Sequence, residues 1–141
     1  MNALTVFVNV KPGHAAALCQ LLKDINAHQR DNAYLQLKND HLTHSSRWVV
    51  VEDEAGAPAR LLLAAEFDGE LDAYLLNQMA ITPGLDEIWG HCEGYPGRDG
   101  FIQYIRKNAF PTQAFYIAFR DETVQSILSK IAVRERLEYL L

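Results

Sequence analysis

The sequence has 141 residues, of which 49% are hydrophobic and 22% charged, a balance typical of a globular domain that folds without disulfides. Its net charge of −5 argues against nucleic acid and against an anionic membrane as partners, because both attract basic proteins. No apolar run approaches the ~20 residues of a membrane span, and the first residues lack the basic region of a signal peptide. We therefore expect one cytoplasmic domain over residues 1–141.

The first half of the chain changes from strand to helix periodicity and back. Apolar residues alternate with a period of two in the strand segments and recur at intervals of three and four in the helix. The expected elements are a strand over 3–10, a helix over 14–31, an irregular connection over 33–46, and strands over 47–52 and 60–67. The turn residues of 53–58 predict that the last two strands form a hairpin.

The second half of the chain contains more helix and one further strand. The expected elements are a helix over 70–80, two short helices within about 84–108, a strand over 113–120, and a long helix over 121–141. Asp68 precedes the first of these helices and Asp121 precedes the last one. An aspartate at such a position accepts hydrogen bonds from the unpaired amides of the first turn, so we expect each to cap its helix.

The segment 84–108 is dense in aromatic residues and glycine. Leu85, Ile88, Trp89 and Cys92 recur at helical spacing, so we expect Trp89 and Cys92 to be buried together. Gly94 and Gly97 flank a proline, which predicts a bend with positive φ at the glycines. Two helices joined by such a bend form a compact flap, inserted before the last strand.

The element order without the flap and the final helix is βαββαβ, the order of the ferredoxin-like unit. The predicted fold is α+β, with a four-stranded antiparallel sheet that carries two helices on one face. The side chains on both faces of the predicted strands are largely apolar, so the second face of the sheet must also be covered. Either the terminal helix folds across that face, or a second copy of the chain does in a homodimer.

In its element order and in the segments LTVFVNVKPGH, RWVVVE and RLLLAAEFDG, the chain resembles the dimeric α/β-barrel group of ferredoxin-like proteins. The run GLDEIWGHCEGYP is similar to segments of uncharacterised bacterial proteins within that group. The resemblance implies two sheets packed face to face and a ligand cavity beside each sheet. It leaves the cofactor unassigned, with haem as an open option because the group includes haem proteins. The GxxDG signature of its dye-decolourising peroxidases is missed, since Gly97 lies one position too late before Asp99 and Gly100.

Two ligand-binding candidates lie at the start of the second strand. His44, three residues after His41, could place an imidazole at the mouth of a pocket, whereas loop histidines are more often solvated or capping groups. Arg47 and Trp48 point to opposite faces, and if Trp48 faces the helices, Arg47 faces the other side. An arginine there would bind a carboxylate or a ligand anion, and the alternative is a strand-end arginine in solvent.

Three further candidates lie in the flap, at Trp89, His91 and Tyr95. Tyr95 could stack on a phenolic ligand, although an aromatic residue more often belongs to the core. His91 beside Cys92 suggests metal binding or thiol activation. Neighbouring helical residues point about 100° apart, however, so His91 is expected to pair with Glu87 and Cys92 to be a buried structural thiol. No metal site is predicted.

Two functions fit these features. The first is a small-molecule binder or an enzyme with little cofactor requirement, of the dimeric α/β-barrel type, which has an apolar pocket under the flap for a small apolar or aromatic ligand. The second is a non-catalytic dimerisation or regulatory module. The sequence has no triad, P-loop, dinucleotide fingerprint or zinc cluster, so it does not decide whether the protein is an enzyme and identifies no catalytic residue.

Overall fold

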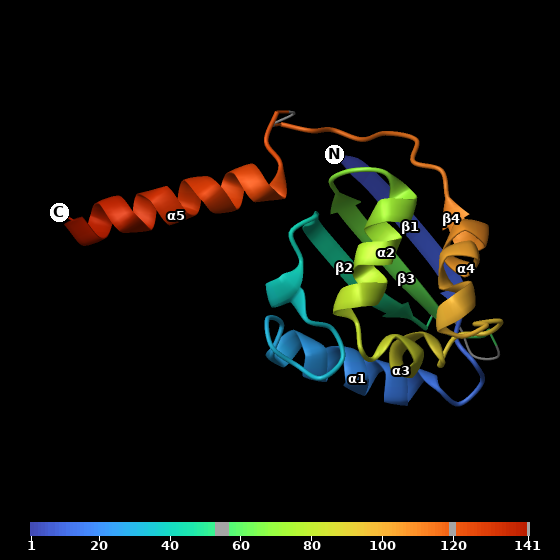
Figure 1. Ribbon diagram of the computed structural model, residues 1–141. Coiled ribbons are helices and arrows are strands. Elements are labelled where there is room, and N and C mark those ends of the chain that lie inside the picture. The colour runs from blue at the N-terminus through green and yellow to red at the C-terminus, as the bar shows by residue number, and fades with distance from the viewer. Residues whose placement is uncertain (53–56, 119–120, 141) are drawn as a thin grey trace.

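The computed structural model describes residues 1–52, 57–118 and 121–140 (Figure 1). The larger part of the predicted turn over 53–58 lies outside the described residues, as do the last two residues of the predicted strand over 113–120. No helix of the described chain is both long and apolar enough to cross a membrane.

The strands and helices of the first half follow the predicted order, with shifted ends. The second strand begins four residues earlier than predicted, because Asp40 accepts hydrogen bonds from the Leu42 and Thr43 amides and so starts the extended segment sooner. The elements are β1 (Asn2–Asn9), α1 (Ala15–Ala27), the 3₁₀ turn η1 (Leu37–Asn39), β2 (Thr43–Val51) and β3 (Arg60–Phe67).

The second half contains short helices, a very short strand and one long helix. The elements are α2 (Leu71–Ile81), α3 (Leu85–Trp89), the 3₁₀ turn η2 (Arg98–Gly100), α4 (Phe101–Asn108), β4 (Ala109–Phe110) and α5 (Val124–Leu140).

The four strands form one sheet in the order β2-β3-β1-β4, and every neighbouring pair is antiparallel. The fold is therefore α+β with a four-stranded antiparallel sheet, an arrangement compatible with the ferredoxin-like fold. In this order β2 is an edge strand, which matters for the site described below.

Strand alternation divides the sheet into two faces. Leu61 and Leu63 of β3 lie opposite Val8 and Val6 of β1, and all four side chains are buried beneath the helices. Trp48 shares that face because it lies opposite Leu63. Since side chains alternate along a strand, Arg47 belongs to the other face, as the sequence predicts.

The segment 84–108 is part of the hydrophobic core. Trp89 is 1% exposed, and its ring lies 5.9 Å from Phe101 and 6.2 Å from Tyr104 between centroids. Cys92 is fully buried, as predicted, and forms an isolated bridge with Val10 of the sheet. Gly94 and Gly97 have φ of 76° and 100°, which confirms the predicted bend.

The predicted strand over 113–120 is wrong for its described part. The fourth strand is instead Ala109–Phe110, which pairs with Val6 and Thr5 of β1. Pro111 follows at once, and proline has no amide hydrogen to continue the ladder. Residues 113–118 then run without a sheet partner among the described residues.

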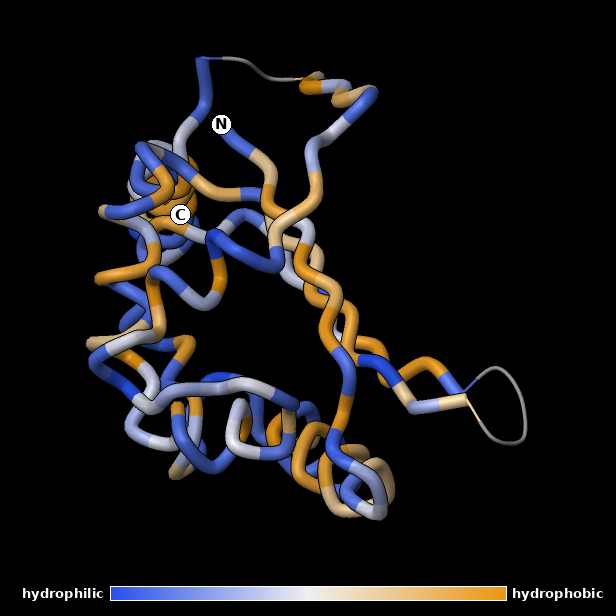
Figure 2. The backbone as a smooth tube through the Cα atoms, turned by 90° about the vertical axis from the view of Figure 1, so that its right-hand side faces the viewer, coloured by the Kyte–Doolittle hydropathy of each residue, from blue (hydrophilic) through white to orange (hydrophobic). Residues whose placement is uncertain are grey.

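Helix α5 begins at Val124 and projects away from the body of the domain (Figure 1). It does not fold across the second face of the sheet, and the view from the side shows α1 to α4 on the other side of the strands (Figure 2). Phe110 and Val49 lie on this open face and are 55% and 36% exposed. The open face therefore has no helical cover within the described chain.

Candidate functional site

A groove of about 710 Å³ runs between helix α1 and the edge strand β2. It exists because no further described strand follows β2 at this edge of the sheet. Its lining residues are Cys19, Leu22, Lys23, Ile25 and Asn26 of α1, Gln29, Leu35, Leu37 and Asp40 of the segment between α1 and β2, residues 43–50 of β2, and Ile88.

The floor of this groove is apolar. Ile25, Leu35 and Ile88 are buried core residues, and Leu22 and Trp48 are partly buried against them. The Trp48 ring also lies 5.5 Å from the Trp89 ring between centroids, so the core fixes its position. A rigid apolar floor of this kind is the usual setting for an aromatic or aliphatic ligand.

Two cations lie on the rim of the groove. Lys23 extends from α1, and Arg47 extends from β2 opposite Ala64. Both side chains are exposed, and neither has a carboxylate partner among the residues that the structure describes. The rim therefore offers positive charge to an anionic group at the edge of an apolar surface.

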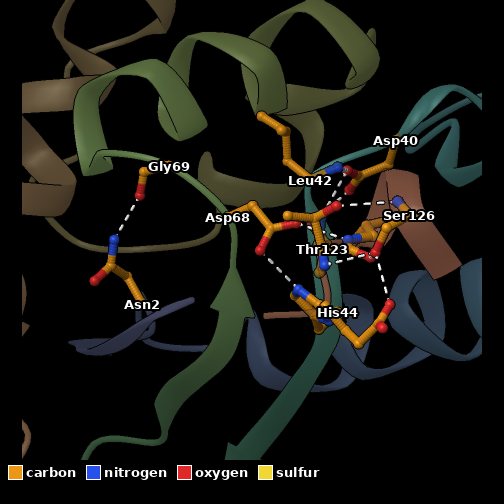
Figure 3. Close-up of polar contacts among 11 residues, drawn as sticks. Asn2, Asp40, Leu42, His44, Asp68, Gly69, Thr123 and Ser126 are labelled. Carbon is orange, nitrogen blue, oxygen red and sulfur yellow. Dashed lines mark hydrogen bonds and ion pairs between the residues drawn. The ribbon is translucent and has the colours of Figure 1, made fainter. Parts of the chain in front are cut away.

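His44 lies at the end of the groove and pairs with Asp68. His44 Nε2 is 2.8 Å from Asp68 Oδ1, and the two side chains are 13% and 14% exposed (Figure 3). The other Asp68 oxygen accepts the Val124 amide of α5 at 2.7 Å. Asp68 therefore holds the imidazole and the first turn of α5 together. The prediction that it caps the helix after 70 is wrong, because the cap residue Glu70 begins α2 without a side-chain cap.

A second polar cluster closes the same end of the groove. Asp40 accepts hydrogen bonds from the Leu42 and Thr43 amides, from the Thr43 hydroxyl at 2.6 Å and from Gln78 at 3.1 Å. Burial favours the neutral acid, but these hydrogen bonds outweigh it and lower the pKa of Asp40. Burial raises the pKa of Tyr74, whose hydroxyl bonds Thr43, to about 12. The cluster is therefore a fixed polar wall.

The structure brings two of the five predicted ligand-binding residues together. His44 and Arg47 both line the groove. Trp89 lies in the core behind the floor of the groove. Tyr95 lies outside the groove lining, and its hydroxyl donates a 2.6 Å hydrogen bond to Asp86. Burial and the Asp86 carboxylate raise the pKa of Tyr95. The predicted flap contributes Ile88 alone to the described lining.

His91 lies at the far end of α1, against His14. The two Nδ1 atoms are 3.0 Å apart, so the predicted pairing of His91 with Glu87 is wrong. The reason is that α3 ends at Trp89 and His91 already belongs to the following turn. Burial raises the pKa of the neighbouring Cys92 to about 12, so that thiol is not an activated nucleophile.

Sequence reasoning missed the α1 side of the groove. Leu22 belongs to the predicted apolar stripe of α1, but the stripe alone does not separate core positions from groove positions. Cys19 and Lys23 flank that stripe and lack any recognisable motif. Their role depends on β2 being an edge strand, which is a property of the sheet order and not of a local pattern.

The described lining of the groove does not fit a metal ion or a haem. The described residues contain no group of three or more His, Cys, Asp or Glu side chains that could hold a metal ion. Among the described lining residues, His44 is the one histidine, and its Nε2 is already bonded to Asp68. An axial haem ligand needs a ring nitrogen directed at the iron, so no residue of this groove is assigned that role.

Comparisons of the chain with protein-family models, with curated proteins and with solved structures find no match.

Proposed function

We propose that the protein binds a small amphipathic molecule in the groove between α1 and β2. The ligand places an aromatic or aliphatic body on Leu22 and Trp48, and an anionic group beside Lys23 and Arg47. The observation that carries this proposal is the groove itself, which joins an apolar floor to two cations without carboxylate partners in the described chain.

The size of the groove supports a ligand with a ring system. Its volume of about 710 Å³ falls within the roughly 300–1,000 Å³ of typical small-molecule sites. The apolar body supplies most of the affinity, because each buried CH₂ contributes about 0.8 kcal/mol. The cations select for the anion, since a hydrogen bond from a cationic donor to an anionic acceptor is roughly twice as strong as one between neutral groups.

The chemistry of the lining supports binding more directly than catalysis. Cys19 lines the groove, but no hydrogen bond joins it to His44 among the described residues. His44 instead pairs with Asp68, which also binds α5. A nucleophile needs a base within hydrogen-bond reach, so the groove fits a binding protein of the dimeric α/β-barrel type.

The same barrel arrangement makes the protein a homodimer through the open face of its sheet. Phe7, Leu62 and Val49 lie side by side across three strands of that face, and Phe110 packs edge-on against Phe7 at 6.5 Å. An apolar patch of this kind usually marks an interface. This observation also favours the second candidate function, a dimerisation module whose groove takes no ligand.

A titration with 8-anilinonaphthalene-1-sulfonate tests the groove, because this fluorescent probe combines aromatic rings with an anionic group. We expect saturable binding at one site per chain. Arg47→Ala should weaken it roughly tenfold, a loss of about 1.4 kcal/mol. Leu22→Glu should abolish it, because a carboxylate on the floor repels the sulfonate and removes apolar contact.

Arg106→Ala is the matched control, since Arg106 pairs with Asp72 outside the groove lining. It should leave the affinity unchanged. Equal affinity in Leu22→Glu and in the unaltered protein would reject the groove as the site. Failure of the unaltered protein to bind the probe would favour the dimerisation module.

A further inference from the structure

Residues 113–118 have the pattern of a strand but no strand partner among the described residues of their own chain. Phe115 and Ile117 alternate with Tyr116 and Ala118, and aromatic and β-branched residues favour strands. No backbone hydrogen bond joins 113–118 to the rest of the described chain. Tyr116 is 87% exposed and Phe115 is 39% exposed. The segment therefore carries unpaired amides and exposed aromatic rings together.

Within the described chain, the β2 edge of the sheet has no strand partner and is long enough to take this segment. Strand β2 spans Thr43–Val51 and pairs on one side with β3, whereas its other side borders the groove. An exposed edge of this length presents a row of unpaired backbone groups and readily accepts another strand. Addition of an extended segment to such an edge is a recurrent mode of recognition.

The segment 113–118 lies on the side of the sheet where a second copy would pack. Together with Ser45 and Glu66, both on the open face, it lines a hollow of about 270 Å³. In Figure 2 it runs past the end of the sheet on the side away from the helices. A second copy seated on the open face would therefore meet it.

The area of the open face shows that a stable dimer needs more than the sheet. Three strands of about eight residues, spaced about 4.8 Å apart, together with the two-residue β4, present on the order of 400 Å² of flat sheet. A standard interface buries about 800 Å² on each partner, so roughly half must come from other elements. Residues 113–118 and the exposed apolar side chains of α5, such as Ile131, can supply this additional interface area.

We propose that residues 113–118 of each chain form a fifth strand on the β2 edge of a second copy. The exchange is symmetric, so both edges are covered at once. The added strand also forms the outer wall of the partner's groove, which is lined by residues 43–50 of β2. This inference rests on the homodimer proposed above and does not depend on whether the groove binds a ligand.

Matched variants at Ile117 test the strand pairing. Ile117→Pro removes one amide donor, whereas Ile117→Ala keeps it and removes the same side chain. Ile117→Pro should raise the dimer dissociation constant roughly tenfold or more relative to Ile117→Ala, because proline cannot donate to the ladder and its ring holds φ near −65°, away from the roughly −140° of an antiparallel strand. The circular dichroism of the monomer should not change, since the amide of 117 has no backbone partner in its described chain.

Hydrogen exchange and cross-linking identify the surface that is paired. In the dimer, the amides of 114–118 and of the outer edge of β2 should become protected together. In a Cys19→Ser background, Tyr116→Cys combined with Ser45→Cys, Ser46→Cys or Arg47→Cys should give a disulfide-linked dimer for at least one pair.

The outcomes separate the two proposals. A dimer with equal dissociation constants for both Ile117 variants and fast exchange over 114–118 would overturn the strand exchange while leaving the homodimer in place. A monomer at tens of micromolar would overturn both, and probe binding by that monomer would leave the groove as the site.

Discussion

Asp68 bonds His44 with one carboxylate oxygen, at 2.8 Å, and the first amide of α5 with the other (Figure 3). The contact joins residues that are 24 positions apart, at the start of β2 and just after β3. It fixes the point at which α5 leaves the domain, beside the end of the groove.

Replacement of Asp68 by alanine should loosen the first turn of α5. Loss of a capping carboxylate costs about 1–2 kcal/mol, and the buried imidazole also loses its partner. We expect faster amide exchange at residues 124–127 and a lower urea midpoint. Asp121→Ala is the control, because Asp121 makes no hydrogen bond to the described residues. If Asp121→Ala increased amide exchange and lowered the urea midpoint more than Asp68→Ala does, Asp121 and not Asp68 would be the residue that caps α5.

Replacement of Trp89 by alanine should destabilise the whole domain. The ring is 1% exposed and contacts Trp48, Phe101 and Tyr104. Removal of such a residue costs about 3–5 kcal/mol. Tyr95→Phe removes a hydrogen bond to Asp86 at the surface of the same segment and should cost about 1 kcal/mol or less. Similar, small losses in urea unfolding for both variants would indicate that 84–108 is a mobile lid.

The two cysteines should differ in their reaction with a thiol reagent such as 5,5′-dithiobis(2-nitrobenzoate). Cys92 is fully buried and its pKa is raised to about 12, so it should react after unfolding. Cys19 is partly exposed in the groove and should react in the native protein. The bound anilinonaphthalene probe should slow that native reaction. Fast reaction that persists in Cys19→Ser would contradict the burial of Cys92.

Stability should depend on the protonation of His91. Burial, with smaller effects of His14 and Lys11, lowers the pKa of His91 from its ordinary 6.5. The unfolded chain therefore binds a proton at His91 at a higher pH than the folded chain does. The contribution of neutral His91 to the free energy of unfolding is fully present above pH 6.5 and is lost as pH falls through the folded-state pKa. The melting temperature should fall less in His91→Gln than in the unaltered protein as pH is lowered from 7.5 through and below 6.5. Equal falls would show that His91 does not titrate with folding.

The sequence predicted the central strands well because their environment is simple. β1 and β3 lie inside the sheet, so alternating residues such as Val6 and Leu63 report directly which side chains face the core. Residues 113–118 have the same alternation, but a strand also requires a partner edge, and Pro111 ends the pairing with β1. Asp68 was expected to act on the next helix, whereas it bonds an element 56 residues away.

Sequence patterns identified those residues of the candidate site that a local pattern marks, but not those that only the fold brings together. His44 and Arg47 were identified because charged residues at the start of a strand are visible in the sequence. Trp89, His91 and Tyr95 were grouped with them because they are close along the chain, but the fold places them around the core and at the far end of α1. Leu22 and Lys23 join the site through the three-dimensional pairing of α1 with an edge strand.

The most direct test of the groove as a binding site is a backbone amide NMR titration of the unaltered protein with the anilinonaphthalene probe. We expect saturable shift changes centred on Leu22, Lys23, Arg47 and Trp48, in the lining of one groove. Changes centred instead on His91 and Tyr95, with the residues of α1 and β2 unaffected, would contradict binding in the groove.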